Sequence, residues 1–518
     1  MFNINVIFFL VLLGLALAGV VHYLGQSRFD LLFKVLLGIL GLALISGIFA
    51  TINKYNNLLV FSIYLAIPFF IPLVYIVHLG FNASLEEALT LLKVPPKEPT
   101  PEIVEEPTRL VFPEIPKAVR LEHMLILGSS GSGKTQLIET LLAQDIFTPS
   151  SVIVFDSQGD LLQEILKVDI PKDRIVYLDP TDVENPIALS FFDFKTSGLT
   201  PYEREKNFNS VVELLLFVLN SLDSGVTAKQ ELCLRMLIRF CLVIPNATIH
   251  TLRELLSEQG FKRYTVHLNK VSETAQHFFK DDYLSKSFGE TREQISRRVY
   301  TILESPLERI LSSPKSRVNM RELLDNGSIV LVNTAKSFLK EQGSAFFARF
   351  ITALIFQAIQ ERDPRKQNLD VFMYIDEAAP IISEQITSIL ETSRKYRLGV
   401  TLAFQSLSQI PTEFAQSIIT NTSVKAVSGI SAKDSRALAD DMKTRPEVLL
   451  SMQKLQFFLY VKGSVSNAYH VPINELQYSP QRSDLAAVLK HNRNRFCRQE
   501  EKKIIATPDD DINTFNKS

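Results

Sequence analysis

The sequence predicts an α/β fold with a mainly parallel sheet, an all-helical insertion and an N-terminal anchor of transmembrane helices. Three observations support this prediction. Apolar, strand-like runs alternate with helical patterns over residues 118–200 and 325–480, as in a parallel sheet covered on both faces. Residues 201–324, between these stretches, show the helical period with almost no strand signal. Residues 1–82 contain three long apolar runs.

The apolar runs of the predicted anchor cover residues 6–23, 31–51 and 58–79. Each is long enough, at about 1.5 Å per residue, to cross a hydrocarbon core about 30 Å thick. None has the polar face of a soluble core helix, and three spans place the two ends of the chain on opposite sides of the membrane. Residues 83–117, rich in Pro, Glu and Lys, should then form an extended linker.

A phosphate-binding motif, G-x-x-x-x-G-K-[ST], lies between an apolar strand and a helical run. Backbone N–H groups of such a glycine-rich turn surround a polyphosphate, and the dipole of the following helix adds positive potential. We expect Lys134 to contact the β- and γ-phosphates of ATP and the Thr135 hydroxyl to hold Mg²⁺. The expected ATP-binding residues are Gly128, Ser129, Ser130, Gly131, Ser132, Gly133, Lys134 and Thr135.

An ATP site also orients the chain in the membrane. ATP is cytoplasmic, so we expect the nucleotide-binding body to face the cytoplasm and Met1 to lie outside. The positive-inside rule agrees, because Arg28 and Lys34 lie in or next to the first loop and only Lys54 lies in the second.

Two further strand ends carry carboxylates. The apolar run at residues 370–375 ends in Asp376 and Glu377. With an upstream phosphate-binding loop, such a pair indicates that Asp376 holds Mg²⁺ and that Glu377 polarises the attacking water. Asp156 follows another apolar run, and it is equally well interpreted as an ordinary loop aspartate or as a residue near the nucleotide.

A polar amide and a cationic cluster flank the next strand. Gln405 ends the run at residues 399–404 and could contact the γ-phosphate or the water. Arg394, Lys395 and Arg397 precede this run, and one of them could act as an arginine finger in a neighbouring subunit's site. Each could equally be a cation that complements a helix C-terminus.

Composition narrows the possible partners. The net charge of -1 and the pI of about 6.7 exclude a global basic field, so any nucleic-acid surface must be a local patch. Cys233, Cys241 and Cys497 lack metal-ligand spacing and are predicted to be reduced thiols.

Residues 481–518 form a polar tail that we expect to be partly disordered, with loose order after about Leu489.

Taken in order along residues 121–480, these motifs resemble the coupling proteins of conjugative type IV secretion. That family belongs with the broader DNA-pumping ATPases that include the FtsK and HerA groups. The resemblance rests on the phosphate-binding loop, the turn at 156–160, the Leu-Asp-Pro at 178–180, the helical insertion, Ser-Pro-Leu at 305–307, Ile-Asp-Glu-Ala at 375–378 and Phe-Gln-Ser at 404–406. The nucleotide motifs are common to the superfamily, whereas the anchor and the insertion favour the coupling proteins.

The resemblance implies a RecA-like P-loop ATPase domain in a homohexameric motor of the inner membrane. Such a motor passes single-stranded DNA, sometimes with attached protein, to a secretion channel, and meets channel or relaxosome-type proteins. By position, the resemblance assigns Lys134 and Thr135 to the phosphate-binding pair. It assigns Asp376 and Glu377 to the pair that holds Mg²⁺ and the attacking water. Gln405 matches the residue that senses the nucleotide, and Arg394 is the preferred candidate for the arginine finger. Coupling proteins usually have two spans and a periplasmic segment, whereas this chain has three apolar runs with short loops.

Other functions compete with an ATP-driven DNA translocase for secretion. One is a DNA pump outside secretion, and another is an ATP-switched membrane receptor that recruits cargo without moving it. Intact Glu377 and Gln405 favour the motor, because a receptor that only bound ATP could dispense with both. An ABC-type transporter is disfavoured, since no Leu-Ser-Gly-Gly-Gln signature lies between Thr135 and Asp376.

Overall fold

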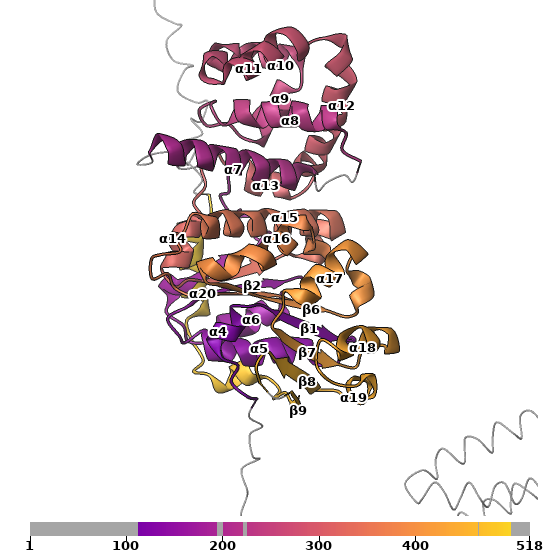
Figure 1. Ribbon diagram of the computed structural model, residues 1–518. Coiled ribbons are helices and arrows are strands. Elements are labelled where there is room, and N and C mark those ends of the chain that lie inside the picture. The colour runs from indigo at the N-terminus through magenta and orange to yellow at the C-terminus, as the bar shows by residue number, and fades with distance from the viewer. Residues whose placement is uncertain (1–111, 194–199, 221–224, 465, 499–518) are drawn as a thin grey trace, which may run out of the picture. The chain divides into compact units, whose positions relative to one another are not determined.

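The computed structural model of the protein describes residues 112–193, 200–220, 225–464 and 466–498 (Figure 1). All of them belong to one compact unit, Pro107–Ser518. The predicted anchor at residues 1–82 and most of the predicted linker lie outside the described residues. Among the described helices, α15 (Lys336–Gln360) is long and apolar enough to cross a membrane, but 72% of its most apolar window is buried in the protein. We therefore treat α15 as a core helix.

A mainly parallel sheet organises the described residues, which confirms the predicted α/β class. Its order is β3-β4-β2-β5-β6-β1-β7-β8-β9, with parallel pairing as far as β7 and antiparallel pairing for the last two strands. The strands are β1 (Met124–Gly128), β2 (Ser151–Asp156), β3 (Ile175–Leu178), β4 (Ile329–Asn333), β5 (Val371–Ile375), β6 (Leu398–Phe404), β7 (Val424–Ser428), β8 (Gln456–Val461) and β9 (Asn467–His470).

Helices cover both faces of this sheet, so its central strands are apolar throughout (Figure 1). Alternate residues of one strand face opposite cores: Leu125 packs in one core and Ile126 in the other. One face is covered by α5 (Lys134–Asp145) and α6 (Asp160–Lys167), and the other by α15, α16 (Glu384–Thr392) and α17 (Thr412–Thr420). Short helices α4 (Lys117–Arg120), α18 (Ala432–Ala439) and α19 (Pro446–Leu450) complete the body.

Helices fill the described part of the stretch that the sequence predicts as an insertion. Side chains fix their starts: Thr227 and Gln230 form a capping box at α8, and Asn319 caps α14. Helix α7 packs on α15, and the apolar faces of the insertion join the core on that side of the sheet. The helices are α7 (Pro201–Asn220), α8 (Ala228–Cys241), α9 (Ile249–Leu255), α10 (Glu258–Tyr264), α11 (Glu273–His277), α12 (Lys286–Leu303), α13 (Leu307–Leu311) and α14 (Met320–Asp325).

The start of the predicted polar tail is ordered, which differs from the expectation of loose order after about Leu489. Residues 485–496 form α20 (Leu485–Phe496), which lies along the edge strand β3. The Asn492 side-chain amide pairs there with the backbone of Tyr177, as a neighbouring strand would. Its Oδ1 accepts from Tyr177 N and its Nδ2 donates to Tyr177 O, both at 2.8 Å. These bonds satisfy backbone groups that an edge strand otherwise leaves unpaired.

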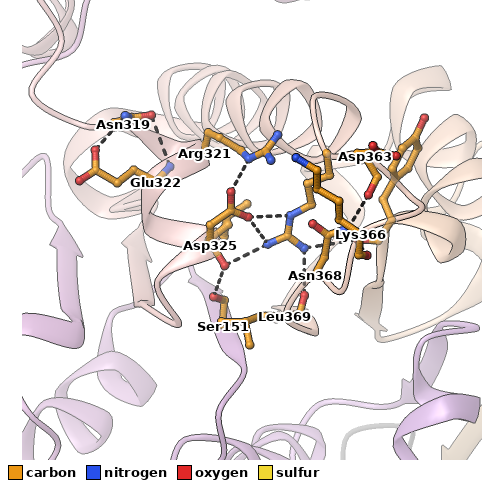
Figure 2. A network of polar contacts seen from close by, with 12 residues as sticks. Ser151, Asn319, Arg321, Glu322, Asp325, Asp363, Lys366, Asn368 and Leu369 are labelled. Atoms are coloured by element: carbon orange, nitrogen blue, oxygen red, sulfur yellow. Dashed lines mark hydrogen bonds and ion pairs between the residues drawn. The ribbon is translucent and has the colours of Figure 1, made fainter.

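A buried arginine joins the insertion to the sheet. Arg362, at the end of α15, has a fully buried side chain and an ion pair of 3.0 Å with Asp325. Its guanidinium also donates to the carbonyl oxygens of Leu324, Leu369 and Tyr396, at 2.9, 3.0 and 3.3 Å. Figure 2 shows this network, in which Asp325 and Leu369 come from segments far apart in the sequence.

A second buried arginine ties α4 to α5 and β5. Arg120 donates to both carboxylate oxygens of Asp145, to Oδ1 at 2.9 Å, and to the Tyr374 hydroxyl, and it stacks over the Phe372 ring at 4.3 Å. Arg120 is 4% exposed, and Asp145 is fully buried. Removal of one partner would leave the other charge without compensation in a dry interior.

We expect Arg120→Met to destabilise the protein by about 3–5 kcal/mol, because the fully buried Asp145 carboxylate loses its ion-pair partner. Thermal unfolding of the full-length chain measures the loss. Arg365→Met is the matched control, since it breaks an ion pair with Asp363 in which the arginine side chain is 88% exposed. An equal fall in unfolding temperature for both variants would contradict the importance of the buried network.

Candidate nucleotide-binding site

Four neighbouring strands end at one cavity. In the order β2-β5-β6-β1, the residues at or just beyond their carboxyl ends are Asp156, Asp376, Gln405 and Gly128. Strand β6 lies beside β5, so the Gln405 strand end neighbours the Asp376 strand end. The cavity has a volume of about 230 Å³ and is lined by Ser130, Gly131, Lys134, Thr135, Asp156, Ser157, Gln158, Asp160, Leu161, Asp376, Glu377 and Gln405.

The glycine-rich turn at residues 128–133 leads from β1 into α5, which begins at Lys134. Gly133 has φ +105°, a conformation that residues with a Cβ rarely adopt. A Cβ on Gly133 would also lie 2.7 Å from Leu455 Cδ2, and Leu455 N donates to Ser132 O at 2.9 Å. Leu455 therefore supports the turn from behind, on the approach to β8.

The Lys134 ammonium lies within the turn. Its Nζ donates to the carbonyl oxygens of Gly128 and Ser129, at 2.7 and 3.1 Å. Burial lowers the pKa of Lys134, against the opposing effect of the Asp376 and Glu377 carboxylates. The cation is thus held beside the cavity by backbone groups that a phosphate could replace.

Thr135 and Asp376 form a pair of oxygen ligands. Thr135 Oγ1 donates to Asp376 Oδ2 at 2.8 Å, across the cavity floor between α5 and β5. Burial raises the pKa of Asp376, the hydrogen bond from Thr135 opposes this, and the Asp156 carboxylate adds to it. A hydroxyl and one carboxylate fit Mg²⁺, which typically takes one or two carboxylates together with phosphate oxygens. Accordingly, the described residues contain no cluster of three or more His, Cys, Asp or Glu side chains suited to a protein-only metal site.

Glu377 is held in a fixed direction. Its backbone has φ +56°, its N–H donates to Asp376 Oδ1 at 3.1 Å, and its Oε2 accepts from Ser157 Oγ at 2.9 Å. A left-handed backbone at a residue with a side chain is unfavourable and tends to occur at functional sites. The sequence assigned no role to Ser157, although this residue lies in the turn at residues 156–160, immediately after the Asp156 strand end.

Asp156 is both a structural residue of its loop and a residue of the cavity, so it fits both interpretations that the sequence left open. It is 6% exposed, and its two carboxylate oxygens accept from Gln158 N and Leu161 N, each at 3.0 Å. These bonds hold the turn between β2 and α6 and satisfy one free backbone N–H in the first turn of α6. The same residue also lines the cavity beside Asp376.

Gln405 reaches the cavity from β6. Its side chain is exposed, and its backbone N–H donates to Gln409 Oε1 at 2.9 Å, which fixes the turn after the strand. The structure thus brings together Gly131, Lys134, Thr135, Asp376, Glu377 and Gln405 around one cavity.

The cationic cluster lies elsewhere. Arg394 precedes β6, so about seven residues of strand, roughly 20 Å, separate it from the Gln405 end. Its side chain is 65% exposed and pairs with Glu122 Oε1 at 2.6 Å. Lys395 stacks over Tyr396, and Arg397 pairs with Asp370. None of these three cations lines the cavity.

Comparison with solved structures supports this fold. The bacterial conjugative coupling protein TrwBdeltaN70 matches with a TM-score of 0.53 and 16% identity, over 73% of this chain and 92% of that chain. The plasmid coupling protein TrwB in complex with ADP and Mg²⁺ matches with a TM-score of 0.53 and 16% identity, over 69% and 87%. TrwB in complex with the GTP analogue GDPNP matches with the same score and 17% identity, over 72% and 89%. At this identity the matches show a shared fold.

The family assignment rests on the sequence. No curated protein matches the chain. The type IV secretion-system coupling protein DNA-binding domain, however, matches residues 109–454 of its 518 residues. That match includes the glycine-rich turn, the insertion, the Asp376 and Glu377 pair, and Gln405, and it confirms the resemblance seen in the sequence. The chain therefore belongs to the family of type IV secretion-system coupling proteins.

Proposed function

We propose that this chain is a membrane-anchored ATPase that moves DNA toward a conjugative type IV secretion channel. The observation that carries the proposal is the position of Glu377, whose carboxylate is held by Ser157 beside the Thr135–Asp376 pair in one cavity. A site that only binds nucleotide has no need of a second, oriented carboxylate. ADP and Mg²⁺ in the related TrwB structure support the choice of ligands.

Each residue would have a separate role. Backbone N–H groups of residues 128–135 and the Lys134 ammonium would bind the phosphates of ATP. Thr135 and Asp376 would hold Mg²⁺, which supplies charge stabilisation as the terminal phosphoryl group is transferred. Glu377 would orient water for in-line attack and accept a proton from it, and Gln405 would contact the γ-phosphate or that water.

The active form is proposed to be a homohexamer in which Arg394 serves the next subunit. Its guanidinium is far from its own cavity and largely exposed, so it is available to a neighbour. In a head-to-tail ring, different surfaces of adjacent subunits meet, and the amino edge of one sheet can face the carboxyl edge of the next. Arg394 would then offer planar, bidentate donors to the neighbour's γ-phosphate.

The proposed location is the inner membrane, with the ATPase body in the cytoplasm and the apolar runs of residues 1–82 as the anchor. The proposed cargo is single-stranded DNA, supported by the DNA-binding domain description of the family. Channel or relaxosome-type proteins are the proposed partners.

Phosphate release by the full-length chain, with and without single-stranded DNA, tests the proposal. We expect hydrolysis that requires Mg²⁺, stops with EDTA and rises several-fold with DNA. Tight ATP binding without phosphate release under any of these conditions would contradict the motor and favour a receptor that recruits cargo. Hydrolysis without a response to DNA would contradict the proposed cargo.

A further inference from the structure

A short segment beside the cavity combines exposed cations with an exposed aromatic ring. Residues 335–340 leave the carboxyl end of β4, which neighbours β2 in the sheet. The side chains of Lys336, Phe338 and Lys340 are exposed, with Phe338 at 36%. By contrast, most of the rest of α15 is buried against the sheet and the insertion.

The backbone of this segment is strained at both ends. Ala335 has φ +44° and Lys340 has φ +61°, ψ 177°, so both lie outside the helical region. Residues with a Cβ adopt such conformations at an energetic cost, and an uninterrupted helix would avoid it. The break at Lys340 sets residues 336–339 apart from the long buried helix that follows. Strain of this kind is typical of sites where a ligand is held.

Hydrogen bonds connect the segment directly to the cavity. Lys336 N donates to Ser157 O at 3.1 Å, and Thr334 N donates to Asp156 O at 2.9 Å. Ser157 Oγ in turn donates to Glu377 Oε2 at 2.9 Å. One residue, Ser157, therefore contacts both the proposed water-orienting carboxylate and the start of the exposed segment.

The exposed groups have the chemistry that single-stranded DNA requires. Within the described part of the chain, neither Lys336 nor Lys340 forms an ion pair with a carboxylate, although Lys340 Nζ donates to Ser337 O at 3.1 Å. Two ammonium groups can bind backbone phosphates, and the Phe338 ring, which lies between them in the sequence, can stack on an unpaired base. A duplex hides its base faces, so the ring selects a single strand.

We propose that residues 336–340 bind single-stranded DNA, with Phe338 stacked on a base and Lys336 and Lys340 on the neighbouring phosphates. Ser157 then links this contact to the carboxylate of Glu377. The inference rests on the proposed function and deepens it by naming the residues that meet the cargo.

Tryptophan fluorescence tests this contact, because the 518 residues contain no tryptophan. A Phe338→Trp variant of the full-length chain keeps an aromatic ring at the site and carries its only indole. We expect an oligodeoxythymidine to quench its emission in a saturable way, at the concentrations where fluorescence anisotropy shows DNA binding. Phe147→Trp is the matched control: Phe147 is 50% exposed and precedes β2, at the opposite edge of the sheet, and its emission should not change.

Affinity provides the second measurement. We expect Phe338→Ala to weaken binding of the oligonucleotide by about 5- to 100-fold, the range for loss of one stacked base. Lys336→Ala with Lys340→Ala should lower the slope of log affinity against log salt by about 1.4, since each lost phosphate contact contributes about 0.7. Lys172→Ala with Lys366→Ala removes two exposed lysines before β3 and β5 and should leave the slope unchanged.

The outcomes separate this inference from the proposed function. Binding by the parent, without quenching of Phe338→Trp and with parental affinity for Phe338→Ala, would overturn the inference alone. No binding by the parent would overturn both the DNA cargo and the inference. Equal quenching of Phe338→Trp and Phe147→Trp would show non-specific association and would also overturn it.

Discussion

Glu377→Gln should bind ATP as tightly as the parent and hydrolyse it about 10²- to 10⁴-fold more slowly, the usual contribution of a positioned general base. The amide keeps the size of the side chain and can still meet Ser157 Oγ, which now lies 2.9 Å from Oε2. It cannot accept a proton from water. The loss therefore falls on turnover and leaves ground-state binding intact.

Lys134→Ala is the companion variant and should show the opposite pattern. Its ammonium lies against the glycine-rich turn, where it would contact phosphate in the bound ground state, so its removal should abolish measurable nucleotide binding. Titration with a fluorescent ATP analogue and phosphate release measure the two effects separately. Parental nucleotide affinity in Lys134→Ala would contradict the assignment of residues 128–135 to phosphate binding.

Arg394→Ala should bind ATP and turn it over about 10³- to 10⁵-fold more slowly, the range found for arginine fingers. Mixing Arg394→Ala with Glu377→Gln subunits should restore part of the activity. A mixed ring contains interfaces with an intact Glu377 on one side and an intact Arg394 on the other. Neither variant alone can form such an interface.

Lys462→Ala is the matched control for Arg394. Both cations pair with Glu122, at 3.1 and 2.6 Å, and both are largely exposed. Although partial burial opposes it, hydrogen bonds from Ser423 and Lys462 lower the pKa of Glu122, so the carboxylate is ionised with either partner. Loss of activity in both variants would indicate disturbance of Glu122 and would contradict a finger. A protein that stayed monomeric and hydrolysed ATP at a specific rate independent of its concentration would also contradict a finger.

Lys395 and Arg397 are the alternative fingers left open by the sequence. Arg397 and Arg394 each pair with a carboxylate of their own chain at 2.6 Å, but Arg397 contacts Asp370 through both Nε and a terminal nitrogen and is less exposed, 48% against 65%. The Lys395 ammonium lies 5.0 Å from the Tyr396 ring centroid. Alanine variants of these two residues should therefore keep most of the activity. A large loss in only one of them would transfer the proposed role to that residue.

The sequence predicted the sheet and the strand-end residues well because both depend on local order. A buried parallel strand followed by polar residues places those residues at the carboxyl edge, whatever the rest of the fold does. Asp376, Glu377 and Gln405 were found in this way, and the structure places all three at one cavity. Their catalytic roles remain predictions.

Contacts between distant segments could not be read from the sequence. Ser157 meets Glu377 across 220 residues, and Arg120 meets Tyr374 across 254. Neither pair leaves a periodic or spaced pattern along the chain. Helix α20 was missed for a related reason: its polar composition suggests a loose tail, and its order comes from packing on β3 and from the Asn492 bonds to Tyr177.

The buried guanidinium of Arg362 has a mechanical consequence. It holds the last residues of α14, the segment before β5, and Tyr396 in the turn that carries Arg394. A push on the insertion would therefore reach the proposed contact with the next subunit through the hydrogen bonds of this one side chain. We expect load on the insertion to alter the timing of hydrolysis in the neighbouring subunit of the proposed ring, so that the ring senses resistance as well as generating force.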